Sequence, residues 1–213
     1  MACAIGFANG FGIVYLGISP IVMTLATNGI LQGCALLYSQ GTPAGFSSPM
    51  LRWFMTAKLG FVTPVVLLMV VFVVVAVLLL GRTPFGRRVY GIGNGLRAAR
   101  LSGIGVERTL ILVYMLSAVC AAIVGIMLTG FSGQASLGMG DDYLLPSIAV
   151  VVVGGALITG GRGHYLGMLG VVLLLTALQM LLAGTTLPYA TRATLYGLVV
   201  LGAVMALRER RLQ

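Results

Sequence analysis

Uncharged polar side chains recur at regular spacing inside a strongly apolar stretch of the chain. Between residues 20 and 39, Thr24, Thr27, Asn28 and Gln32 are spaced so that they share one face of a helix. Hydroxyl and amide groups both donate and accept hydrogen bonds, so this face could line a path for an uncharged polar solute. Interhelical hydrogen bonding, which these residue types commonly provide in membranes, explains the same face equally well.

Two further amides, Asn9 and Gln179, lie in other apolar runs. They are additional candidates for such a path, although interhelical hydrogen bonding is the favoured interpretation for these two. The complete set of candidate path residues is Asn9, Thr24, Thr27, Asn28, Gln32 and Gln179.

Signatures of enzymes and of metal sites are absent from the sequence. It contains no Walker A pattern, no HExxH and no GxSxG, so we expect no catalytic residues. Cys3, Cys34 and Cys120 all lie in apolar runs without metal or disulfide spacing, so they are interpreted as packing residues. We therefore expect no metal and no cofactor bound to this chain.

The composition requires a lipid environment. The chain of 213 residues is 59% hydrophobic and only 8% charged, with a mean hydropathy of +1.09, whereas about a quarter of the residues of a soluble domain are charged. The net charge of +9 does not indicate nucleic-acid binding, because no soluble domain exists to present a basic face.

Apolar runs of nearly bilayer-spanning length predict an all-α, polytopic membrane helix bundle. We expect seven membrane segments in a single domain covering residues 1–213. None of them contains Asp, Glu, Lys, Arg or His, which argues against a proton- or ion-coupled transporter and favours a neutral solute. The segments are approximately 2–17, 20–39, 61–80, 109–131, 145–160, 165–184 and 193–207.

The arginines predict the orientation of the chain. Six of them lie between Arg82 and Arg108 beside a single acid, Glu107, so the 81–108 loop is expected to be cytoplasmic. Alternation of the segments then places the 132–144 loop outside, and Arg162 and the 208–211 tail inside. The 40–60 loop, with Arg52 and Lys58, falls outside, against the charge rule. The N-terminus also falls outside and begins within a span, so we expect an odd number of upstream helices to be missing.

The 81–108 loop itself is patterned. Gly91, Gly93 and Gly95 suggest a flexible entry, and Asn94 is a candidate N-cap. Good helix formers then run over residues 96–102 and end at Gly103, a suitable C′ residue. A helix of two turns is not stable alone, so it needs a partner surface. Binding of the arginines to lipid headgroups is the alternative reading of this loop.

The sequence Gly93-Asn94-Gly95-Leu96-Arg97-Ala98-Ala99-Arg100-Leu101-Ser102-Gly103-Ile104 resembles the cytoplasmic coupling segment of ribose-type ABC importer permeases. The lead-in Arg82-Thr83-Pro84-Phe85-Gly86-Arg87 and the glycine pairs at 154–155 and 160–161 are similar to that family too, so the likeness covers nearly the whole chain. Arg97 replaces a residue that is usually Glu in the family, and Leu96 one that is often Pro. Members of the family also carry additional N-terminal helices, so the chain looks N-terminally truncated.

The resemblance implies a permease subunit of an ABC importer for a monosaccharide or a similar small neutral solute. Its implied partners are a cytoplasmic ATP-binding subunit that hydrolyses ATP, a second permease copy, an extracytoplasmic solute-binding protein and membrane lipid. The implied location is the bacterial inner membrane, with a cytoplasmic C-terminus. The ATPase-coupling residues would be Asn94, Arg97, Ala98, Ala99, Arg100, Leu101, Ser102 and Gly103. A passive facilitator or channel and a non-transporting, truncated membrane scaffold are the alternatives.

Overall fold

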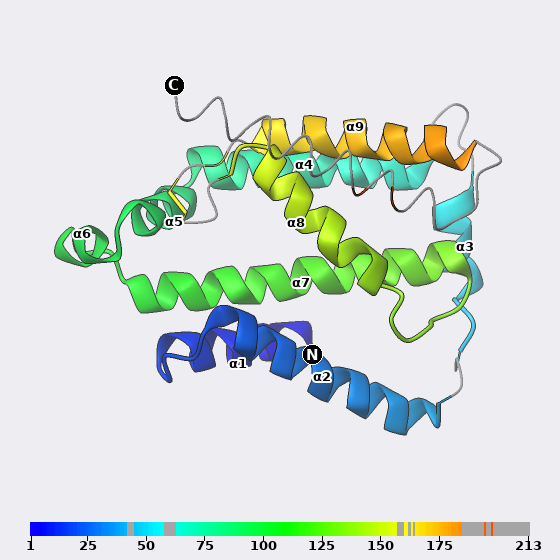
Figure 1. Ribbon diagram of the computed structural model, residues 1–213, viewed down its shortest axis with the longest axis horizontal. Helices are drawn as coiled ribbons and strands as arrows, with labels where there is room; N and C mark the ends of the chain where they lie inside the picture. Colours follow the sequence, from blue (N-terminus) through cyan, green and yellow to red (C-terminus); the bar gives the residue numbers. More distant parts are fainter. Residues whose placement is uncertain are drawn as a thin grey trace. The chain divides into compact units, whose positions relative to one another are not determined.

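The computed structural model describes residues 1–41, 45–57, 63–156, 160–161, 163, 165–184, 194 and 197. Within these residues every regular element is a helix, as the long apolar runs predicted (Figure 1). The α-helices are α1 (Ala2–Val14), α2 (Pro20–Ser39), α3 (Pro49–Thr56), α4 (Pro64–Arg82), α5 (Pro84–Asn94), α6 (Leu96–Leu101), α7 (Val106–Ser132), α8 (Leu144–Val153) and α9 (Tyr165–Ala183). A single 3-10 turn, η1 (Asp141–Tyr143), precedes α8.

Four of these helices are long and apolar enough to cross a bilayer, so the chain is a multi-pass membrane protein. They are α2, α4, α7 and α9, and they correspond to the predicted segments 20–39, 61–80, 109–131 and 165–184. Proline occupies the first turn of α2 and of α4, where its missing N–H removes no helical hydrogen bond.

The other three predicted spans are not confirmed. The 2–17 segment forms α1, whose 13 residues are too few to span, and the 193–207 segment lies outside the described residues apart from Thr194 and Gly197. The helix that the structure describes within the 145–160 segment is shorter than that segment. Helix α8 stops after 10 residues at Gly154, which makes it about 15 Å long, against a hydrocarbon core of about 30 Å. The apolar run continues past this point, but Gly155 adopts a left-handed φ of +90° that ends the helix.

The described residues fall into two compact units. The first contains Met1–Val89 and Leu96–Asp141, and the second contains Tyr90–Gly95 and Asp142–Gln213. Helix α5 therefore contributes its first half to one unit and its last turn to the other. Whether the chain is one permease domain stays a prediction.

In the first unit, α1 lies along α7, because glycines let the two backbones approach closely (Figure 1). A Cβ added to Gly6 would lie 2.6 Å from the Cα of Met115, and one added to Gly10 would lie 3.0 Å from the Cα of Ile111. The predicted small-residue pair Gly6/Gly10 is therefore a packing surface. The second predicted pair, Gly29/Gly33 on α2, has no atom within 4 Å of either added Cβ.

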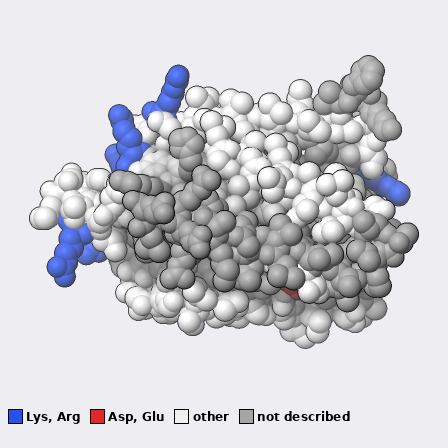
Figure 2. Space-filling model, turned by 45° about the horizontal axis from the view of Figure 1, so that its top comes forward, with Lys and Arg blue, Asp and Glu red and all other residues white. Residues whose placement is uncertain are grey.

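The basic side chains of the first unit separate along the length of α7. Helix α3, which carries Arg52, packs against the C-terminal end of α7, where Leu51 and Met55 meet Gly130. Arg108 lies in the first turn of α7, and α6 with Arg97 and Arg100 packs at that same end. Figure 2 shows arginines gathered at one end of the visible face and again, more sparsely, at the opposite end. Within the first unit, Arg52 and the arginines Arg97, Arg100 and Arg108 therefore lie at opposite ends of α7. On which side of the membrane each end lies stays a prediction. Lys58, Arg162 and the 208–211 tail lie outside the described residues.

In the second unit, α8 packs against α9. The close point of this hairpin is Gly154, where an added Cβ would lie 2.6 Å from the Cα of Met168. The predicted glycine-rich region thus permits close helix packing at Gly154.

Candidate functional site

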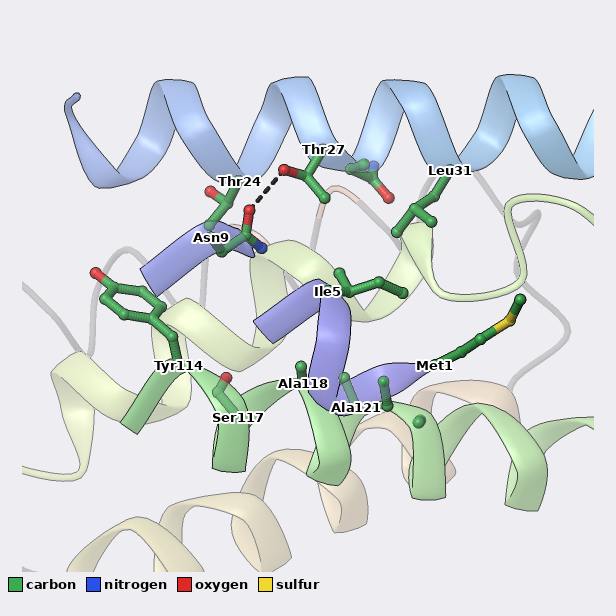
Figure 3. Close-up of a pocket in the computed structure, with 13 residues that line it drawn as sticks. Met1, Ile5, Asn9, Thr24, Thr27, Leu31, Tyr114, Ser117, Ala118 and Ala121 are labelled. Atoms are coloured by element: carbon green, nitrogen blue, oxygen red, sulfur yellow. Dashed lines mark hydrogen bonds between the residues drawn. The ribbon is translucent and has the colours of Figure 1, made fainter. Parts of the chain in front are cut away.

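A cavity of about 540 Å³ lies between α1, α2 and α7 of the first unit (Figure 3). Its volume falls within the range of small-molecule sites, about 300–1,000 Å³. Polar and apolar side chains both face it, and none of the lining residues carries a charged side chain. The lining residues are Met1, Ala2, Ile5, Asn9, Thr24, Thr27, Asn28, Leu31, Tyr114, Ser117, Ala118, Ala121 and Ala122.

A hydrogen bond between α1 and α2 crosses one wall of this cavity. The Thr27 hydroxyl donates to Asn9 Oδ1 at 2.5 Å, and it also lies 2.9 Å from the Met23 carbonyl oxygen of its own helix. The Thr24 hydroxyl donates to the Pro20 carbonyl oxygen at 2.8 Å, which leaves its oxygen lone pairs able to accept. Figure 3 shows Asn9, Thr24 and Thr27 close together where α1 meets α2.

The structure thus brings four of the six predicted path residues to one cavity. Asn9, Thr24, Thr27 and Asn28 line it. Gln32 is exposed on α2 and does not line the cavity, whereas Gln179 is exposed on α9 in the second unit. Asn9 also makes the interhelical hydrogen bond that was favoured for it. A role for these residues in solute passage stays a prediction.

Sequence reasoning missed the wall contributed by α7. Tyr114, Ser117, Ala118, Ala121 and Ala122 face the cavity from this helix. Their spacing of three and four residues marks one helical face that is polar at one end and small at the other. This pattern was readable in the sequence, but only the structure shows that the face meets the Thr24–Asn28 side of α2.

We expect Thr27→Val to lower the free energy of unfolding by about 1 kcal/mol, the usual size of an interhelical hydrogen bond in a membrane. Valine keeps the branched shape but leaves Asn9 Oδ1 without its donor. Chemical unfolding in detergent micelles measures the change. Thr129→Val is the matched control, because the Thr129 hydroxyl bonds to the Gly125 carbonyl of its own helix. Equal losses in the two variants would contradict a special role for the Asn9–Thr27 bond.

The short helix α6 is the second candidate site, and its predicted C-terminal cap is confirmed. The Ile104 N–H donates to the Ala99 carbonyl at 3.1 Å, the Gly103 N–H donates to the Arg100 carbonyl at 3.1 Å, and Gly103 has a φ of +76°. This pair of hydrogen bonds is a Schellman motif, which requires a left-handed residue at C′. Gly103 therefore fixes the end of α6.

Most of the surface of α6 is exposed. Ala99 is buried, with 3% of its surface exposed, and α6 packs against α7. Leu101 is 90% exposed, and Arg97, Ala98, Arg100, Ser102 and Gly103 are exposed as well. Arg100 pairs with Glu107 at 3.0 Å, but this ion pair is open to solvent and so contributes little stability. Ala99 packs α6 against its unit, and the other predicted coupling residues of this segment, Arg97, Ala98, Arg100, Leu101, Ser102 and Gly103, are exposed.

The predictions for the entry to this helix are wrong. Residues 84–94 form helix α5, so Gly91 and Gly93 are helical, and Asn94 is its last residue, not the N-cap of α6. Thr83 accepts a hydrogen bond from the Gly86 N–H at 3.3 Å, and Pro84 occupies the first helical position. The Thr83 cap and Pro84 at N1 favour the start of a helix at this point. The three glycines lower the stability of that helix but do not prevent it from forming.

Comparison with known proteins identifies the family. Residues 1–207 match the family described as "Branched-chain amino acid transport system / permease component". The chain belongs to this permease family. It is 37% identical over 215 aligned residues to the autoinducer 2 import system permease protein LsrD of Yersinia enterocolitica, covering 96% of this chain and 65% of that protein. It is 35% identical over 207 residues to the ribose import permease protein RbsC of Bacillus subtilis, covering 95% of this chain and 63% of that protein.

These relatives confirm the predicted resemblance to ribose-type importer permeases, and they are permease components, not enzymes. The permease chain spans less than two thirds of the length of these curated relatives. No solved structure matches it.

Proposed function

We propose that this permease is the membrane-spanning subunit of an ABC importer, driven by a separate ATP-binding subunit. The observation that carries the proposal is the exposed, firmly capped helix α6, with Leu101 directed away from the rest of its unit. An exposed leucine beside arginines suits a protein partner. A passive channel would not need such a helix, and the family membership supports the importer reading.

The proposed solute is a monosaccharide or a similar small neutral molecule. The cavity between α1, α2 and α7 offers hydroxyls and amides without charged side chains, which suits a solute rich in hydroxyls. The names of the relatives, an autoinducer 2 and a ribose import permease, support a solute of this class.

The proposed assembly contains a cytoplasmic ATP-binding subunit, a second permease copy and an extracytoplasmic solute-binding protein in a bacterial inner membrane. The basic end of α7, with α6, faces the cytoplasm, because arginines accumulate on that side of membrane proteins. The C-terminus would then be cytoplasmic too. ATP would bind the partner, and no cofactor is proposed for this chain.

Uptake of labelled monosaccharides into proteoliposomes, in which the orientation of the permease has been determined, tests this function. The permease is reconstituted with the ATP-binding subunit and solute-binding protein encoded by neighbouring genes, and ATP is enclosed or omitted. An importer requires ATP and both partners. Uptake that survives without ATP would identify a passive facilitator, and no uptake under any condition would identify a scaffold.

A further inference from the structure

The last turn of α5 touches a glycine turn that lies far away in the sequence. Both segments belong to the second unit. A Cβ added to Gly93 would overlap the backbone nitrogen of Gly161 and lie 2.8 Å from its Cα. A Cβ added to Gly160 would lie 3.2 Å from the Cα of Gly93. The two segments therefore meet backbone to backbone, with no room for a side chain between them.

The glycine turn can adopt this shape only without side chains. Gly160 and Gly161 have φ values of +90° and +85°, which other residues strongly avoid. A Cβ on Gly161 would also overlap Oδ1 of Asn94. Asn94, predicted as a coupling residue of α6, therefore lies against this turn.

A hydrogen bond also joins the same two segments. The Tyr90 hydroxyl, one turn before Asn94, donates to the Gly163 carbonyl oxygen at 3.1 Å. We call this set, Tyr90, Gly93, Asn94, Gly160, Gly161 and Gly163, the glycine joint. It combines close backbone packing with a side-chain hydrogen bond.

The joint connects the proposed ATPase-docking helix to the α8–α9 hairpin. Gly95 is the one residue between α5 and α6, so a shift of α6 acts directly on the turn that holds Gly93 and Asn94. On the other side, the joint lies in the connection between α8, which ends at Gly154, and α9, which begins at Tyr165. The contacts between Gly93 and the glycine turn are made by backbone atoms. A displacement of one backbone therefore moves the other, because no side chain between them can rotate to absorb it.

We propose that the glycine joint transmits movement of α6 to the α8–α9 hairpin, and that Gly93, Asn94 and Gly161 are positioning residues of transport coupling. This inference rests on the proposed importer function. It differs from docking, because the joint is made by residues of this chain alone and needs no contact with the ATP-binding subunit.

Gly93→Ala tests the contact by the sign of its effect on stability. Alanine in place of a helical glycine normally stabilises a helix. A methyl group at Gly93 meets the Gly161 backbone instead, so we expect the Tm in detergent to fall by about 5 °C. The matched control is Gly170→Ala on α9 of the same unit, where no atom lies within 4 Å of the added Cβ, so its Tm should stay or rise. A Tm for Gly93→Ala that equals or exceeds that of the unmodified protein overturns the joint.

The coupling role is tested with the reconstituted importer. Gly93→Ala should retain the ATP-binding subunit on co-purification and hydrolyse ATP, but transport solute about tenfold more slowly per ATP. Tyr90→Phe keeps the ring and loses the hydrogen bond to Gly163, so it should lower the amount of solute transported per ATP by less than Gly93→Ala does. This second variant keeps the coupling role testable if Gly93→Ala fails to fold. Unchanged solute-to-ATP ratios in both variants overturn the coupling role. If the unmodified protein shows no ATP-driven uptake, the proposed function falls and the coupling role with it, while the Tm comparison still reports on the contact.

Discussion

Leu101→Asp is expected to abolish co-purification of the ATP-binding subunit and ATP-driven uptake while leaving the permease folded. Leu101 is 90% exposed, so the substitution removes no packing within the chain. In the proposed complex this side chain becomes buried, and a carboxylate in an apolar contact without a partner is strongly unfavourable. We expect an affinity loss of about a hundredfold, equivalent to about 2.7 kcal/mol. Affinity measured in nanodiscs and the Tm of the free permease separate docking from folding.

Arg100, beside Leu101, needs a different substitution because it forms an ion pair with Glu107. Arg100→Glu would create two adjacent carboxylates with Glu107, so Arg100→Gln is the cleaner removal of the charge. Glu107→Gln releases Arg100 without removing it, and should leave docking intact or strengthen it. Arg52→Gln, on α3 at the other end of α7, is the matched control, because it removes the charge of another exposed arginine. If Leu101→Asp and Arg100→Gln both bind the ATP-binding subunit with unchanged affinity, α6 does not have the proposed docking role.

The second large effect is expected from Gly6→Leu, which should detach α1 from α7. A Cβ at Gly6 already lies 2.6 Å from the Met115 Cα and 2.7 Å from the Tyr114 carbonyl oxygen. Because these are backbone atoms, no side-chain rotation can relieve the clash. We expect a loss of about 3 kcal/mol in the free energy of unfolding, at the upper end for overpacking.

Uptake should also be lost in Gly6→Leu, because α1 supplies Ile5 and Asn9 to the cavity. The control is Gly33→Leu on α2, where an added Cβ meets no atom of the chain within 4 Å. Unfolding in mixed micelles measures the free energy of unfolding of both variants. If Gly6→Leu is as stable as Gly33→Leu, the close approach of α1 to α7 is wrong.

Several features followed from local sequence alone. The four long spans were predictable because the transfer free energy of a segment into lipid is a sum over its own residues. The end of α6 at Gly103 was predictable too, because a Schellman motif is closed by neighbouring backbone groups around one left-handed residue. The resemblance to this family was likewise recognisable in the contiguous residues 93–104, and the family match itself covers residues 1–207.

Other features depended on which segments meet in space. Gly6/Gly10 and Gly29/Gly33 have the same spacing, yet only the first pair packs against a helix of this chain in the described structure. Thr27 and Gln32 share a predicted stripe, but only Thr27 reaches Asn9 on α1. The α7 wall of the cavity was missed because a helical face of polar and small residues does not by itself show which other helix it packs against.

The sequence by itself determined that this is a multi-pass membrane permease with a short capped helix beside its arginines, since those properties reside in adjacent residues. Only the tertiary structure decided which polar side chains share the cavity, that α8 stops at Gly154, and that Asn94 lies against Gly161 and not at the start of α6. These outcomes depend on contacts between residues far apart in the chain, such as Gly93 with Gly161, whose close approach no local pattern encodes.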